Sequence, residues 1–231
     1  MFTGLIEAIG RIETLDAVPA GGRLRVSTPL AAEIRPGDSV AVNGTCLTAV
    51  DPDAHGFSAD LGPATLQATS LGGMRVGQVV NLERPLRADA RMGGHFVLGH
   101  VDGVGVIRSI RPEGDSHWID IDLPADLESL VVLKGSIAID GISLTIAAMA
   151  PGTIAVQIIP FTFAHTSLGV AEPGDAVNVE VDVLGKYVAR LLSAGALDLQ
   201  RRSPEPQTRT PEPQNRTPEP QNPGTPEPLP R

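Results

Sequence analysis

The sequence predicts an all-β protein: two tandem, duplicated Greek-key β-barrels, followed by a C-terminal amphipathic helix and a disordered tail. Three observations predict this fold class. They are an internal repeat offset by 97 residues, period-two alternation of apolar residues in each copy, and 25 glycines and 21 prolines among 231 residues. So many turn-forming residues favour short strands over long helices. At 42% hydrophobic the chain can bury a core.

The repeat comes first because it determines the domain count. The segment Ser39-Val-Ala-Val-Asn-Gly-Thr-Cys-Leu-Thr48 returns 97 positions later as Ser136-Ile-Ala-Ile-Asp-Gly-Ile-Ser-Leu-Thr145. Thr69-Ser-Leu-Gly72 returns at the same offset as Thr166-Ser-Leu-Gly169. Solenoid repeats are roughly 20–50 residues long, so this period predicts two domains rather than an array. We expect a first barrel at 1–97, a second at 98–184, a helix at 185–198 and a tail at 199–231.

Strands are predicted where apolar residues alternate with small or polar ones, as in residues 40–43 and 137–140. Asn43-Gly44 and Asp140-Gly141 are expected to turn the chain between two strands, because both residue types tolerate positive φ. Several short strands within fewer than a hundred residues favour a small closed barrel, since closure removes exposed strand edges.

One helix is expected after the second repeat. Leu184, Val188, Leu191 and Leu192 share one face of it. This apolar stripe can pack on the second barrel or on the same helix of a neighbouring subunit, and the sequence leaves both open. The Thr-Pro-Glu-Pro-Gln repeats that follow contain too few apolar residues to offset the entropy of ordering, so we expect disorder there.

Charge and cysteine content exclude several function classes. A formal net charge of −9 argues against a nucleic-acid partner, which requires clustered Lys and Arg. With Cys46 as the only cysteine no intramolecular disulfide can form, and no signal peptide or membrane-spanning run is visible. The expected location is the cytoplasm. His95 and His100 would point to opposite faces of a strand, so we expect no metal.

Two nearly identical motifs are the candidate sites. They differ at one chemically important position, Cys46 against Ser143. In an alternating strand Cys46 and Thr48, or Ser143 and Thr145, project on one face and can line one cavity. Hydroxyls of this kind more often bond to backbone, but the duplication favours two related pockets with unequal roles.

Three further side chains have alternative interpretations. His100, flanked by glycines, is either structural or open to a ligand. Lys134 can meet a phosphate or polyol, or simply cap a solvent edge. Asp182 stands at the mouth of the second barrel, where it can also cap the helix.

At these residues the sequence resembles the riboflavin synthase family, which is built from two lumazine-binding repeats. The similarity covers roughly residues 1–195 and rests on five ordered segments: Met1–Glu7, Val42–Thr48, Gly93–Gly103, Ile139–Thr145 and Val177–Asp182. Any one alone would be weak evidence, whereas five in order are specific. Phe161 and Ala64 depart from the polar residues that relatives often carry.

The resemblance implies the family's reaction, in which one 6,7-dimethyl-8-ribityllumazine passes a four-carbon unit to a second and riboflavin forms without a cofactor. It also implies a homotrimer whose active site joins the first barrel of one subunit to the second barrel of its neighbour, with lumazine synthase as a further partner. The implied catalytic residues are Cys46, Ser143, Asp182, His100 and Phe2.

The resemblance implies one substrate pocket per barrel. The first would use Gly4, Leu5, Ile6, Ser39, Cys46, Leu47, Thr48, Asp60, Leu61, Gly62, Pro63, Ala64 and Thr65. The second would use Gly99, His100, Val101, Lys134, Ser143, Leu144, Thr145, Ile159, Pro160, Phe161, Thr162, Phe163 and Ala164. A non-catalytic lumazine- or flavin-binding antenna protein is the alternative, although such binders can dispense with one pocket and this chain keeps both motifs.

Overall fold

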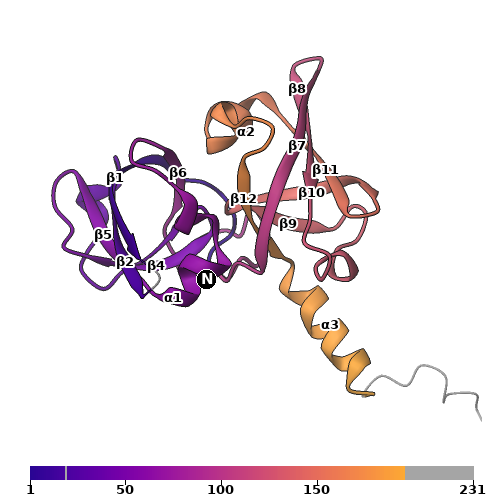
Figure 1. The fold of residues 1–231 in the computed structure, drawn as a ribbon, viewed down its shortest axis with the longest axis horizontal. Coiled ribbons are helices and arrows are strands. Elements are labelled where there is room, and N and C mark those ends of the chain that lie inside the picture. Colours follow the sequence, from indigo (N-terminus) through magenta and orange to yellow (C-terminus); the bar gives the residue numbers. More distant parts are fainter. Residues whose placement is uncertain (19, 196–231) are drawn as a thin grey trace, which may run out of the picture. The chain divides into compact units, whose positions relative to one another are not determined.

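The computed structural model describes residues 1–18 and 20–195 (Figure 1). Two closed antiparallel barrels of six strands each follow one another along the chain, which confirms the expected fold class. The expected tail at 199–231 lies outside the described residues, as do the last positions of the expected helix, 196–198.

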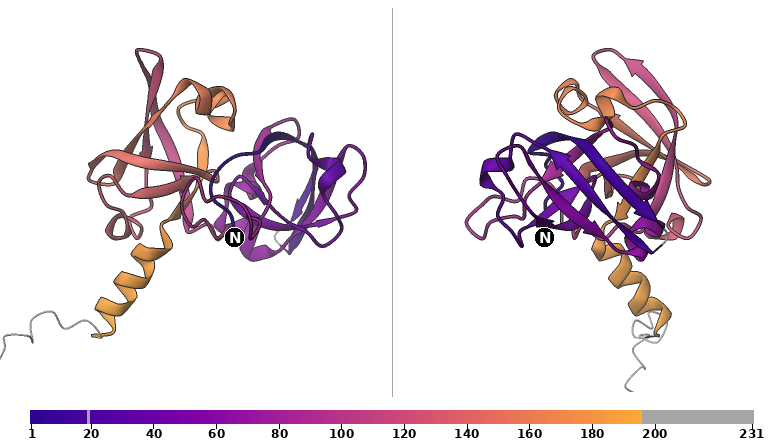
Figure 2. Two further views of the ribbon diagram at one scale, coloured as in Figure 1. Left: turned by 180° about the vertical axis from the view of Figure 1, so that it is seen from behind. Right: turned by 60° about the vertical axis from the view of Figure 1, so that its left-hand side comes forward.

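The two barrels have the same topology (Figures 1 and 2). The strands of the first are β1 (Ala8–Val18), β2 (Gly21–Ser27), β3 (Ser39–Val42), β4 (Thr45–Val50), β5 (Gly56–Leu61) and β6 (Val79–Glu83). Those of the second are β7 (Gly103–Glu113), β8 (Ser116–Asp122), β9 (Ser136–Ile139), β10 (Ile142–Ala150), β11 (Thr153–Ile158) and β12 (Ala176–Val181). Around the first barrel the order is β1-β2-β5-β4-β3-β6, and the second barrel repeats it strand for strand.

Short helices occur at equivalent points of the two repeats. The α-helices are α1 (Pro63–Ala68) and α2 (Pro160–Ala164), each with proline in its first turn. Proline suits this position because its fixed φ matches a helix and its missing N–H would have no helical partner. The 3₁₀ helices are η1 (Ala31–Glu33), η2 (Ser70–Gly73), η3 (Glu128–Leu130) and η4 (Ser167–Val170).

The two expected turns are present. Asn43 and Gly44 have φ of 44° and 74°, and Asp140 and Gly141 have φ of 45° and 78°. Two consecutive residues with positive φ form the type I′ turn that joins antiparallel strands in register. The turns connect β3 to β4 and β9 to β10, which places the two repeated motifs on equivalent hairpins.

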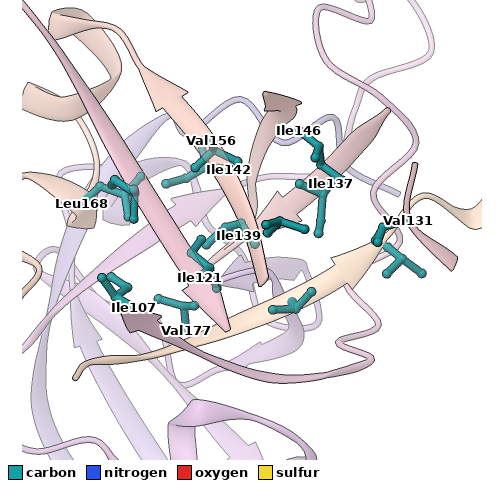
Figure 3. Close-up of a cluster of buried hydrophobic side chains, with 14 of the residues drawn as sticks. Ile107, Ile121, Val131, Ile137, Ile139, Ile142, Ile146, Val156, Leu168 and Val177 are labelled. Atoms are coloured by element: carbon teal, nitrogen blue, oxygen red, sulfur yellow. The ribbon is translucent and has the colours of Figure 1, made fainter. Parts of the chain in front are cut away.

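Side chains fill the barrel interiors. In the second barrel, Ile121, Ile137 and Ile139 lie in one buried cluster (Figure 3). Phe57 and Leu82 occupy the first barrel in the same way, and both are fully buried. Because buried apolar side chains occupy both interiors, we expect a ligand to bind on the outside of a barrel or between barrels.

The C-terminal helix α3 (Val183–Ser193) begins two residues earlier than the expected 185. The Asp182 side chain accepts a hydrogen bond from the backbone N–H of Leu184 at 3.0 Å, which caps the helix. The helix ends before Gly195, whose φ of 67° is typical of a C-terminal cap. No helix of the described residues is long and apolar enough to cross a membrane.

The apolar stripe of α3 is exposed. Leu184, Val188 and Leu191 are 61%, 51% and 44% exposed, and no residue of the helix is buried. Of the two alternatives, packing of the stripe on the second barrel is therefore not what the described chain shows.

Candidate active site

The N-terminal segment lies between the two barrels and contacts both. Phe2 pairs with Val97 as an isolated antiparallel bridge, with N–H···O distances of 2.7 Å from Phe2 and 3.2 Å from Val97. The Phe2 side chain is fully buried in a small cluster with Val97, Ala41 and Ala138. Because Phe2 has no exposed surface, its contribution within this chain is to hold the crossing segment in place.

Two buried glutamates anchor the crossing segments. Glu83, at the end of β6, accepts hydrogen bonds from the backbone N–H groups of Thr3 and Gly4 at 2.6 and 2.9 Å. Glu180, at the equivalent point of β12, accepts from Gly99 and His100 at 3.0 Å each. Burial raises the pKa of both carboxyls, although the N–H groups oppose this rise.

Each of these two segments, at residues 3–4 and 98–100, contacts the hairpin of the other repeat. The carbonyl of Gly4 accepts a hydrogen bond from the N–H of Ser143 at 2.8 Å, and the carbonyl of Gly99 accepts from the N–H of Cys46 at 2.9 Å. Ile6 packs against the core of the second barrel. The sequence resemblance groups residues 4–6 with Cys46, whereas within the described chain Gly4 and Ile6 contact the second barrel.

Both crossing points require glycine. Gly4 and Gly99 have φ of +78° and +79°, and a Cβ on either would lie 2.6 Å from the Cβ of Ser143 or Cys46. Such contact leaves no room for a side chain. The exchange therefore places residues 4–6 at the Ser143 hairpin and residues 99–101 at the Cys46 hairpin.

The strand residues of the two motifs lie as the alternation predicts. Cys46 and Ser143 are partly exposed, and Thr48 and Thr145 are exposed. Ser39 faces Thr48 in the register of β3 and β4. Leu47 is buried between the two exposed positions, whereas Leu144 is partly buried. Each hairpin thus presents a thiol or hydroxyl with a threonine on one outer face.

His95, which was considered from the sequence only as a metal ligand, lies beside the candidate residue Ser143. Its Nδ1 lies 2.7 Å from Oγ of Ser143, and its Nε2 is buried with no hydrogen-bond partner in the described residues. Burial lowers the pKa of the imidazole, while the charge of Asp182 opposes this change. Burial therefore favours the neutral form of His95 beside Ser143. Its 48-residue separation from Ser143 left no local signal in the sequence.

Residues 60–65 of the first barrel span the end of β5 and the first turn of α1. Asp60 is engaged by Arg23, with a 2.7 Å ion pair that lowers the pKa of its carboxyl. Leu61 is buried in the core, and Gly62 precedes the exposed Pro63 and Ala64. Thr65 is partly buried, and its carbonyl accepts a hydrogen bond from the Thr69 hydroxyl at 2.7 Å.

The equivalent loop of the second barrel is aromatic. Phe163 stacks on His117 with ring centroids 3.8 Å apart, and Phe161 stacks on His165 at 4.1 Å. Ile159 and Phe161 are 57% and 68% exposed. Pro160, Thr162 and Ala164 belong to the same short helix, α2. The two loops therefore differ in chemistry although they occupy equivalent positions.

The remaining candidate residues are Lys134, His100 and Asp182, and none of them hydrogen-bonds to Cys46 or Ser143 in the described chain. Lys134 is exposed, has a φ of 66°, and places Nζ 3.4 Å from the carbonyl of Ala147. His100 is exposed, while its backbone is fixed by Glu180. Asp182 caps α3, as its alternative interpretation predicted. Among these three, Asp182 also acts on His95, because its charge opposes the fall in the pKa of that imidazole.

Two asparagines lock the barrels together, and the sequence argument assigned them no role. Asn81 in β6 donates to the carbonyl of Asp140 at 3.0 Å, and Asn178 in β12 donates to the carbonyl of Asn43 at 2.8 Å. Both side chains are 1% exposed. Their equivalence was visible in the repeat, but their partners lie in the opposite barrel and could not be read from one copy.

Comparison with known families agrees with the duplication. The family described as the lumazine binding domain matches residues 3–85 and again 98–182. Fold and site therefore define a protein with two tandem lumazine-binding domains.

Curated relatives show which family of proteins with two lumazine-binding domains this chain is similar to. Riboflavin synthase of Mycobacterium tuberculosis is 45% identical over 204 residues, which cover 84% of this chain and all of the relative. Riboflavin synthase of Bacillus subtilis is 40% identical over 193 residues, covering 83% of this chain and 90% of the relative. The chain thus belongs to the riboflavin synthase family, which is a family of enzymes.

Solved structures with the same fold carry ligands. Crystal structures of LumP bound to 6,7-dimethyl-8-(1'-D-ribityl) lumazine and to riboflavin match with TM-scores of 0.72 and 0.74. Each is 27% identical and covers 78% of this chain and 99% of the matched chain.

Proposed function

We propose that the chain is a riboflavin synthase acting on two molecules of 6,7-dimethyl-8-ribityllumazine. One molecule passes a four-carbon unit to the other, giving riboflavin and 5-amino-6-(D-ribitylamino)uracil in the final step of riboflavin biosynthesis. The observation that carries the proposal is the pair of crossed half-sites, Gly4 on Ser143 and Gly99 on Cys46, in a chain 40–45% identical to riboflavin synthases.

Each half-site would bind one substrate. The half-site of the first barrel would combine residues 46–48, Ser39, residues 60–65 and the crossing segment 99–101. The half-site of the second barrel would combine residues 143–145, Lys134, residues 159–164 and the crossing segment 4–6. Every residue expected to bind substrate is kept. Compared with the grouping expected from the sequence, residues 4–6 now join the Ser143 hairpin and residues 99–101 join the Cys46 hairpin, as their contacts suggest.

The chemistry requires mainly that two lumazines be held face to face. The C7 methyl of a lumazine is acidic because its carbanion delocalises into the ring, so the substrate acts as its own electron sink. Fixing both reactants in one geometry replaces an encounter in solution by an effectively unimolecular step, worth up to ~7–11 kcal/mol. No external oxidant or reductant is needed, because one substrate gains the carbon unit that the other loses.

Protons would be handled at the rim of the half-sites. Ser143 is hydrogen-bonded to His95, whose neutral form burial favours, and this contact keeps the hydroxyl oriented. Cys46 occupies the equivalent position without a histidine partner among the residues that the structure describes. Together with His100 and Asp182 these groups are our candidates for removing and returning the methyl proton.

The half-sites need a second subunit. None of the residues that form them lines the cavity of about 670 Å³ between the barrels, and several of them are exposed, such as Thr48 and Thr145. The exposed apolar stripe of α3 supplies a surface for self-association. We therefore propose a homotrimer in which the first barrel of one subunit faces the second barrel of its neighbour, working in the cytoplasm, with lumazine synthase as a further partner.

A non-catalytic lumazine- or flavin-binding protein is the second candidate. It is favoured by one specific observation, the likeness to ligand-bound LumP. Retention of both motifs argues for the enzyme, because a binder needs only one pocket.

Incubation of the full chain with 6,7-dimethyl-8-ribityllumazine decides between the two. We expect riboflavin absorbance to rise, with one riboflavin formed for two lumazines consumed. Tight ligand binding with no riboflavin formed would reject the enzyme in favour of the binding protein.

A further inference from the structure

A cavity of about 670 Å³ lies between the two barrels and contains none of the candidate site residues. Both repeats line it with equivalent positions. Three of these pairs are Ser70 and Ser167, Gly77 and Gly174, and Val79 and Ala176. The cavity thus lies along the local two-fold relation between the barrels. Its volume is within the range of about 300–1,000 Å³ that small-molecule sites occupy.

Two buried polar side chains that line this cavity are only half satisfied. Asn43 and Asp140 are 2% and 6% exposed. Oδ1 of Asn43 accepts from the N–H of Asn81 at 2.7 Å, and Oδ1 of Asp140 accepts from the N–H of Asn178 at 2.8 Å. In the described part of the chain, Nδ2 of Asn43 and Oδ2 of Asp140 make no hydrogen bond. Because both residues line the cavity, this donor and this acceptor are available to a ligand that enters it.

A hydroxyl adds to this set. Ser70 also lines the cavity, and its Oγ is buried without a partner among the described residues. Ser167, its equivalent, accepts a hydrogen bond from Asn81 at 2.8 Å and retains its own O–H. An amide, a carboxylate and hydroxyls gathered in this way suit the hydroxyl groups of a sugar, each of which both donates and accepts.

Positive charge lies on one side of the same cavity. Arg11 and Arg75 line it from the first barrel, and neither forms an ion pair within residues 1–18 and 20–195. Arg11 donates one hydrogen bond, to the carbonyl of Gly77. The second repeat has Glu172 where the first has Arg75. Two exposed guanidiniums without a carboxylate partner can bind a phosphate through charge-assisted hydrogen bonds.

We propose that the cavity between the barrels binds a sugar phosphate, with the phosphate at Arg11 and Arg75 and the sugar hydroxyls at Asn43 and Asp140. The carboxylates that line the cavity, Asp140 and Asp175, belong to the second barrel, whereas both arginines belong to the first, so this placement keeps the phosphate with the arginines and limits its repulsion by the carboxylates. This site is separate from the half-sites for lumazine, since the two share no lining residue.

Calorimetric titration of the full chain with ribose 5-phosphate tests the proposal, with ribose and inorganic phosphate as separate probes. We expect saturable binding of ribose 5-phosphate that weakens about tenfold or more in Arg75→Gln and Arg11→Gln, because each loses a charge-assisted contact. Arg35→Gln removes the same charge from an exposed position that lines no cavity described above, and should bind as the unsubstituted chain does. Ribose alone should bind at least about tenfold more weakly.

Three outcomes would overturn the proposal. One is the absence of saturable binding by ribose 5-phosphate. Another is binding that both substitutions leave unchanged. The third is competition between ribose 5-phosphate and a lumazine, which would place the phosphate ligand in the half-sites instead.

Discussion

Gly44 and Gly141 meet backbone to backbone between the two barrels. A Cβ on Gly44 would lie 2.7 Å from the backbone nitrogen of Gly141, and a Cβ on Gly141 would lie 2.7 Å from that of Gly44. Both residues also adopt positive φ, at 74° and 78°. The type I′ turns of the two repeats thus form a close contact across the local two-fold relation, and they leave no space for any side chain.

Gly44→Ala should therefore destabilise the chain through two separable effects. Positive φ alone costs an alanine about 1 kcal/mol. The clash with Gly141 should add about 1–3 kcal/mol, because the neighbouring atoms are backbone and cannot move aside. Urea-induced unfolding measures the total.

Gly152→Ala is the matched control for that substitution. Gly152 has a φ of +70°, and no atom lies within 4 Å of the point that an alanine Cβ would occupy, so it isolates the backbone effect. Equal losses of stability in the two variants would show that contact between the turns contributes nothing.

Asp140 gives the protein a pH-dependent stability. Burial raises its pKa from 3.8 to about 7, and the nearby charge of Asp175 adds to the rise. Between these two values the folded chain binds a proton that the unfolded chain has released, so this group makes folding less favourable as pH rises. The cost is absent below about pH 3.8 and complete above about pH 7.

Asp140→Asn should remove this cost. The first repeat already has an asparagine, Asn43, in the equivalent position, where its Oδ1 accepts the same kind of backbone hydrogen bond. We expect the variant to gain stability over the unsubstituted chain as pH rises from about 4 to about 7, by about 1.4 kcal/mol per unit of pKa shift. Chemical unfolding at about pH 5 and about pH 8, on either side of the raised pKa, checks this. A stability difference that does not change between the two pH values would contradict it.

The fold could be predicted from the sequence because the signals for strands and turns are local within each copy of the repeat. The alternation in residues 40–43, the turn at Asn43-Gly44 and their repetition 97 residues later all depend on neighbours along the chain. The expected start of α3 was two residues too late. Asp182 had two alternative interpretations, as a residue at the barrel mouth and as the cap of the helix, and in the structure it is the cap.

The arrangement of the site was less accessible, because it depends on exchange between copies. Nothing near Gly4 in the sequence indicates that its carbonyl meets Ser143, 139 residues away. The sequence pattern would be the same whether residues 4–6 and 99–101 contacted their own barrel or the other one. His95 was undervalued for the same reason, since its partner Ser143 lies on a hairpin of the second repeat.

His100 is the candidate best suited to a test of catalysis without loss of fold. Its side chain is exposed, and its backbone N–H is held by Glu180 at 3.0 Å, so the position of the ring does not depend on core packing. His100→Gln keeps a polar side chain and removes the proton-transfer group. We expect kcat for riboflavin formation to fall about tenfold or more, with unchanged unfolding free energy. His55→Gln, at an exposed histidine in the turn before β5, is the control and should retain full turnover.

Self-association through α3 is the remaining prediction. Val188 and Leu191 lie in the exposed apolar stripe, and the paired substitution Val188→Glu with Leu191→Glu places two charges there. Burying these charges in a subunit interface would cost several kcal/mol, so the variant should sediment as a monomer. Ser193→Glu puts a charge on the opposite face of the same helix and should leave the assembly intact. In the proposed trimer each half-site faces a neighbouring subunit, so the monomeric variant should also lose riboflavin formation while its circular dichroism stays that of two folded barrels. A double variant that still sediments as a trimer would exclude α3 as the contact surface.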